Sequence, residues 1–167
     1  SQMIKKVYTV KGNSCSEDSF YLRVELILKV EKAKIIHEVK VYNACINPVD
    51  VSVMAMTDTE LGTADGTNNN INLYSDGNGG TYIKDDAGFK LYIEPVDNVE
   101  RTIAGPTKAF TEAKLAAATN ASGQAKDKQL TNGVNSAVYF ISETKTLEGA
   151  DEEDSSCDAV GEGFTFI

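Results

Sequence analysis

The sequence has only one histidine, His37, and no tryptophan. Serine and cysteine nucleophiles normally need an adjacent base, and this histidine lies among apolar residues in a strand-like segment. No pair of carboxylates has a context that marks it as a general acid and base. We therefore predict that the protein is not an enzyme and has no catalytic residue. A hydrolase that uses paired carboxylates is the remote alternative.

Cysteine is also scarce, and the three residues Cys15, Cys45 and Cys157 form no C-x-x-C pair. A structural zinc site needs about four Cys or His ligands at regular spacing, which this set does not supply. A single disulfide with one cysteine left over fits better and indicates an oxidising compartment. We therefore predict a secreted protein.

One segment begins like a calcium-binding loop, with Asp76 and Asn78 at its first and third positions. The sixth position holds Thr81 where such loops have glycine, and the twelfth holds Ala87 where they have glutamate. A hairpin turn is the favoured interpretation. We predict no bound metal and no cofactor.

Basic residues are the minority, since 16 Lys and Arg against 25 Asp and Glu give a net charge of −9. Nucleic acid and anionic membrane surfaces both attract basic faces, so neither is expected as a partner. No stretch approaches the roughly 18 uninterrupted apolar residues of a membrane-spanning helix. Membrane insertion is therefore not expected either.

What the sequence has in quantity is period-two alternation of apolar and polar residues, which is typical of half-buried strands. Alternating or strand-like runs occupy residues 20–30, 35–46, 49–56, 89–95 and 134–143. Two further strands, 71–74 and 82–84, flank a glycine-rich hairpin signal at 75–80. Residues 108–118 suit a short helix or a strand. This pattern predicts an all-β, antiparallel sandwich.

The two ends of the chain are strand-like as well. In residues 3–10, the bulky side chains of Ile4, Tyr8 and Val10 share one face, and Phe164 and Phe166 belong to an aromatic closing strand at 163–167. Exposed sheet edges aggregate unless something pairs with them, and fibre subunits use a neighbour's terminal segment for this purpose. We predict that these three side chains insert into a neighbouring subunit.

The order of features resembles a chaperone–usher fimbrial subunit, or pilin. The patterns that carry the resemblance are Val10–Cys15, Val39–Cys45 with Val51–Val53, Leu130–Asn135 leading into Tyr139 and Phe140, and Gly163–Ile167. The resemblance implies an incomplete immunoglobulin-like sandwich that a donor strand completes. It divides the chain into a donor extension at 1–10 and one domain at 11–167.

The same resemblance implies a Cys15–Cys45 disulfide, which would close a loop of about thirty residues and stabilise the fold by roughly 3–4 kcal/mol. Cys157 has no partner in this scheme. It would pair with a neighbouring subunit, or with Cys45 and leave Cys15 free. The segment before Cys15 is shorter than a full donor strand, which fits a trimmed chain, a terminal subunit or another filament family.

From these features we expect a structural subunit of an extracellular fimbria that polymerises by strand exchange and supports adhesion. Its expected partners are copies of itself or other fimbrial subunits, together with a periplasmic chaperone and an usher. The alternative is a monomeric binding module, such as an adhesin domain or a virion tail or decoration protein.

Overall fold

The computed structural model describes residues 2–12, 20–44, 47–61, 64–65, 73–75, 81–85, 87–105, 128–129, 137–149 and 161–167. Within these residues every regular element is a β-strand, and nearly all pairings are antiparallel. The predicted all-β, antiparallel fold is confirmed, while the immunoglobulin-like sandwich stays a prediction. The described part of the chain contains no helix long and apolar enough to cross a membrane.

The chain forms two compact units. Unit 1 comprises Ser1–Val53 and Glu143–Ile167, and unit 2 comprises Met54–Ser142. The sequence pattern did not anticipate this division. It also treated residues 49–56 as one strand, whereas the structure has two strands there, one in each unit.

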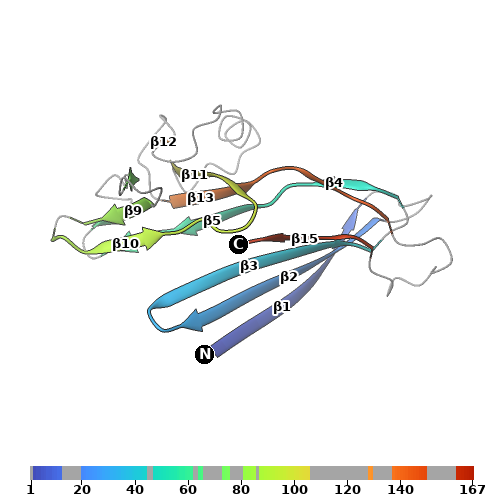
Figure 1. The fold of residues 1–167 in the computed structure, drawn as a ribbon, viewed down its shortest axis with the longest axis horizontal. Helices are drawn as coiled ribbons and strands as arrows, with labels where there is room; N and C mark the ends of the chain where they lie inside the picture. The colour runs from blue at the N-terminus through green and yellow to red at the C-terminus, as the bar shows by residue number, and fades with distance from the viewer. Residues whose placement is uncertain are drawn as a thin grey trace. The chain divides into compact units, whose positions relative to one another are not determined.

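Unit 1 contains a four-stranded sheet of order β1-β2-β3-β15 and a separate ladder of β4 with β14 (Figure 1). Its strands are β1 (Gln2–Gly12), β2 (Phe20–Glu31), β3 (Lys34–Asn43), β4 (Val49–Val51), β14 (Lys145–Leu147) and β15 (Gly163–Phe166).

The first three strands form a long antiparallel meander. β1 and β2 pair without interruption from Gln2 opposite Val30 to Gly12 opposite Phe20. A two-residue turn, Lys32 and Ala33, connects β2 to β3, and Lys32 adopts the left-handed conformation with φ 55°. β-Branched and aromatic residues favour such strands because they pack well on a pleated surface.

Asn43 joins the two ladders of unit 1. It is fully buried at the end of β3, and its Nδ2 donates to the carbonyl oxygens of Asn47, Leu147 and Glu148 at 2.7, 3.2 and 3.4 Å. Its backbone N–H also donates to the carbonyl of Glu162 at 3.1 Å. One amide therefore satisfies buried backbone groups from several segments, which an apolar side chain could not do.

Unit 2 contains a sheet of order β12-β11-β13-β5, a sheet of order β10-β9-β8, and a short β6–β7 ladder. Its strands are β5 (Met54–Asp58), β6 (Glu60–Leu61), β7 (Ala64–Asp65), β8 (Tyr74–Ser75), β9 (Thr81–Lys84), β10 (Lys90–Ile93), β11 (Val99–Gly105), β12 (Lys128–Gln129) and β13 (Ala137–Ser142). β11 and β12 form a parallel pair.

β13 supplies the core of unit 2 on both of its faces. Val138 packs with Leu73 and Ile83 in one buried cluster, and Ala137 and Tyr139 form another against partly buried methionines. Alternate residues of a strand point to opposite faces, so one central strand serves both clusters.

Candidate assembly surface

The register of the unit 1 sheet gathers apolar residues on one of its faces. Directly opposite residues of antiparallel strands share a face. Ile4 is opposite Leu28, Tyr8 is opposite Val24, and Val10 is opposite Leu22. The same row of β2 continues into β3, where Val24 is opposite Val41, and Val41 is opposite Phe164 of β15. We call this side of the sheet the apolar face.

Much of the apolar face is exposed. Ile4 is 59% exposed and Ile35 is 64% exposed, which are high values for aliphatic side chains. The exposed apolar members of this face are Ile4, Tyr8, Val10, Leu26, Val30 and Ile35. The exposed Lys6 and His37 lie among them on the same face. Exposed apolar surface that is bordered by polar residues usually marks an interaction site.

The outer edge of β1 completes this surface. β1 is the terminal strand of its sheet, and within the described residues only β2 pairs with it. Each described side chain from Gln2 to Val10 is exposed. A long strand at the edge of a sheet presents unpaired N–H and C=O groups that another strand can join.

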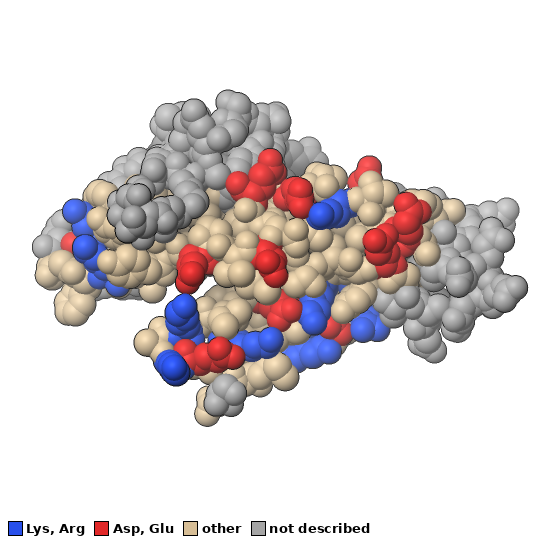
Figure 2. Space-filling model, viewed as in Figure 1, with Lys and Arg blue, Asp and Glu red and all other residues tan. Residues whose placement is uncertain are grey.

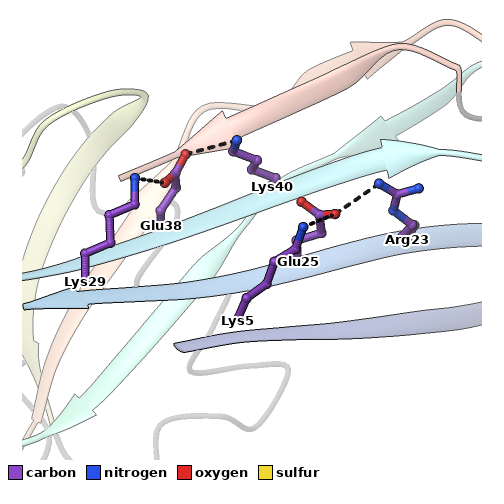
Figure 3. Close-up of polar contacts among 6 residues, drawn as sticks. All are labelled: Lys5, Arg23, Glu25, Lys29, Glu38 and Lys40. Atoms are coloured by element: carbon purple, nitrogen blue, oxygen red, sulfur yellow. Dashed lines mark hydrogen bonds and ion pairs between the residues drawn. The ribbon is translucent and has the colours of Figure 1, made fainter. Parts of the chain in front are cut away.

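The opposite side of the same sheet, which we call the charged face, carries ion pairs (Figure 3). Glu25 accepts from Lys5 and Arg23, each at 3.0 Å. Glu38 pairs with Lys29 at 3.3 Å and with Lys40 at 3.5 Å. Each carboxylate is buried, and each has cations from neighbouring strand positions around it.

Glu25 is held in its ionised form. The hydrogen bond from Lys5 lowers the pKa of the Glu25 carboxyl below its ordinary value, with a further contribution from Arg23, while burial opposes the shift. A stabilised carboxylate of this kind is a poor proton donor near neutral pH. Its arrangement therefore suits strand pairing rather than acid–base chemistry.

Charges of both signs are interspersed along this part of the molecule in Figure 2. The two faces of the sheet thus differ in their share of charged residues, while Met3 and Val7 are exposed apolar residues of the charged face. On the charged face, ion pairs between strands of the same chain neutralise the buried carboxylates. The apolar face has exposed aliphatic groups, which lose unfavourable contact with water when a partner covers them.

The structure places the predicted assembly residues as follows. Ile4, Tyr8 and Val10 do share a face, and they lie on a strand that is paired with β2 of the same chain. Their donation to a neighbouring subunit stays a prediction. Phe164 and Phe166 lie in β15 and are buried beside β3.

Other predicted features lie outside the described residues. These are the cysteines Cys15, Cys45 and Cys157, the 76–80 turn and the 108–118 segment. Among described residues, no group of three or more His, Cys, Asp or Glu side chains could hold a metal ion.

Sequence reasoning missed Leu26, Val30 and Ile35 as parts of the surface. Their alternation was visible, and it predicted strands with one apolar side. It also suggested that this side would be buried, which is the usual outcome for such strands. Only the registers of β1 with β2 and of β2 with β3, together with the exposure of these side chains, show that they extend the face formed by Ile4, Tyr8 and Val10.

Unit 2 presents a second surface feature, a row of three tyrosines across β8, β9 and β10, in which Tyr92 is exposed and Tyr74 and Tyr82 are half-buried. The Tyr74 and Tyr82 rings stack at 5.4 Å, and the Tyr82 and Tyr92 rings lie 5.5 Å apart. Lys84 and Lys90 are directly opposite each other, and their ammonium groups lie over the rings of Tyr74 and Tyr82 at 4.4 and 4.8 Å. We call these five residues the tyrosine row.

Comparison of the chain with models of protein families found no match, and comparisons with curated proteins and with solved structures found none either.

Proposed function

We propose that the protein is a structural subunit of an extracellular surface filament and that it associates with neighbouring subunits through the apolar face and the β1 edge. The observation that carries this proposal is the exposure of six apolar side chains on three paired strands, the outermost of which ends the sheet. Burial of apolar area stabilises association by about 25 cal/mol per Å² before the costs of binding.

The single-chain pairing of β1 bears on how assembly takes place. A donated strand would have to leave β2, with which it pairs over its whole length. Addition of a neighbour at the outer edge of β1 requires no such separation. The same edge would serve a periplasmic chaperone and an usher, the partners that the pilin resemblance implies.

The proposal is tested by changing the apolar face and imaging the result. The double variant Ile4→Ser/Val10→Ser reduces the apolar area of the face without altering the charged face. We expect negative-stain electron microscopy to show filaments for the unchanged protein and none, or far fewer, for the variant.

The matched control is Val96→Ser, because Val96 is 56% exposed but belongs to unit 2. This control should leave filaments intact. An unchanged protein that stays monomeric at every accessible concentration would refute the filament proposal.

The tyrosine row supports a second candidate function, that of a binding module such as an adhesin domain. Two lysines directly opposite each other repel, and an anion bound between them would relieve that repulsion. This local pair beside aromatic rings therefore suits an anionic ligand, even though the net charge of the chain is −9. We propose an acidic saccharide, whose sugar ring stacks on tyrosine while its acid group meets a lysine.

Titration calorimetry with dextran sulfate would test this candidate, with neutral dextran as the control. Saturable binding that is lost in Tyr92→Ala/Lys84→Gln would favour the binding module. Heat of binding that is absent, or equal for the two polymers, would remove it.

A further inference from the structure

We infer that β1 pairs with β1 of a second copy of this chain in an antiparallel register centred on Val7. The inference rests on the proposed function, because it names the partner of the β1 edge and the geometry of the contact. Two properties of β1 support a second copy as the partner strand. They are the order of its residues and the faces that the register brings together.

The first constraint is the match of faces. Directly opposite residues share a face, so a register centred on a residue places even-numbered positions opposite even-numbered ones. The apolar face of one copy then continues into the apolar face of the other. A register centred between two residues would join the apolar face to the charged face, which leaves apolar side chains beside charges.

The second constraint is charge. β1 contains Lys5, Lys6 and Lys11 and no acidic residue, and lysines on an edge strand normally hinder pairing. A register centred on Lys6 places that lysine opposite its own copy, and one centred on Tyr8 places Lys5 opposite Lys11. The register centred on Val7 places no lysine directly opposite another.

The same register uses the whole strand. β1 has 11 residues, and Val7 is the middle one of Gln2–Gly12. Ile4 then lies opposite Val10 of the second copy, Lys6 lies opposite Tyr8, and Lys5 lies opposite Thr9. Ile4 and Val10 form an apolar pair, Met3 lies opposite Lys11, and Lys6 meets the aromatic ring of Tyr8, which is a favourable pair. The positions of the lysines thus allow the long register centred on Val7 and disfavour the registers centred on Lys6 and Tyr8.

This contact joins two four-stranded sheets into one continuous sheet with a doubled apolar face. A two-fold contact closes on itself, so the pair would be the repeating unit of the proposed filament. Growth then needs a second contact, and the doubled apolar face is the surface that remains for it, since sheets stack face to face about 10 Å apart.

The sharpest test is Val7→Lys, measured by sedimentation equilibrium. Within one chain, position 7 is opposite Glu25, so a lysine there meets an acid and the fold should persist. Between copies, two lysines would face each other on the two-fold axis. We expect the dissociation constant of the pair to rise about tenfold or more.

Two further variants read the register directly. Thr9→Glu places a glutamate of each copy opposite Lys5 of the other copy, so the pair gains two new ion pairs. The dissociation constant should fall about fivefold. Lys6→Thr would strongly tighten a register centred on position 6, but should weaken the Val7 register, which loses its two contacts between Lys6 and Tyr8. Circular dichroism of each variant verifies the fold. If Val7→Lys does not fold, the tighter association expected for Thr9→Glu still tests the register.

Salt separates self-pairing from an acidic partner. Two lysine-bearing strands should associate more tightly as salt screens their repulsion, whereas a strand of opposite charge would bind more weakly. The inference would be overturned if salt raised the dissociation constant of the pair. It would also be overturned if Val7→Lys and Thr9→Glu left that constant unchanged.

The outcomes also distinguish this inference from the proposed function. Filaments that persist unchanged in Val7→Lys would refute the register and retain the filament. Pairs that respond to the variants as the Val7 register predicts, but that never extend into filaments, would support the register and refute the filament.

Discussion

β1 and β13 are both antiparallel strands with bulky residues, yet their environments are opposite. β13 lies between two other strands and has five of its six residues buried. β1 ends its sheet, and each of its described side chains is exposed. The comparison shows that apolar content alone does not make a core strand. β13 is covered on both faces by residues of its own unit, whereas the side chains of β1 from Gln2 to Val10 are exposed on both faces of the sheet.

The largest expected effect comes from truncating one tyrosine in each strand. Tyr139→Ala removes a ring that is 1% exposed, and should lower the free energy of unfolding by about 3–5 kcal/mol because a cavity remains. Tyr8→Ala removes a ring that is 46% exposed, and should change stability by about 0.5 kcal/mol or less. Urea denaturation of the two variants measures the difference. Equal losses would contradict the contrast between the strands.

Asn43 tests whether unit 1 depends on a buried polar group as unit 2 depends on its apolar clusters. Asn43→Ala leaves the carbonyls of Leu147 and Glu148 without this donor. We expect a loss of about 2–3 kcal/mol, again by urea denaturation. The control is Asn47→Ala, which keeps the backbone carbonyl that accepts from Asn43. A similar loss in the control would point to the loop itself rather than to the amide.

Two glycines sharpen the comparison because each unit requires one for a different reason. A Cβ at Gly163 would lie 2.7 Å from the Tyr42 ring, and Gly88 has a φ of +95°. Either change to alanine should cost about 1 kcal/mol. Tyr42→Ala should relieve the cost at Gly163, since it removes the contact. It should leave the cost at Gly88 unchanged, and a double-mutant cycle measures both.

The smallest expected effect is the contribution of Glu25 to the loss of stability at low pH. Its folded-state pKa is lowered, chiefly by the hydrogen bond from Lys5. Its contribution to stability is therefore fully present above the ordinary unfolded-state pKa of a glutamate and is lost as the pH falls through the lower folded-state pKa. The free energy of unfolding should fall less between pH 7 and pH 3 in Glu25→Gln than in the unchanged protein. Glu31→Gln, at an exposed position, is the control.

Much of the strand content could be predicted from local pattern. The runs at 20–30, 35–46, 89–95 and 134–143 correspond to β2, β3, β10 and β13. β11 and β14 were not predicted, because Val99–Gly105 lacks clear alternation and Lys145–Leu147 is only three residues long. The break at Ser52 and Val53 was also missed, since alternation continues through it while the chain passes from one unit to the other.

For the candidate assembly surface, the local pattern identified a common face on one strand but did not extend it to the neighbouring strands, and the assembly role itself stays a prediction. Period two was enough to place Ile4, Tyr8 and Val10 on one face. The places of Leu26 and Val30 on this face depend on the register of β1 with β2, and that of Ile35 depends on the register of β2 with β3. The role of Asn43 depends on segments about a hundred residues away in the chain.

The sequence by itself determined that the chain is all-β and which residues of each strand share a side, because alternation is a property of neighbouring residues. Only the tertiary structure decided which strand is central and which ends a sheet, which apolar faces are covered, and which carboxylates are ion-paired. Those outcomes depend on contacts between distant segments, whose free energies no local pattern contains.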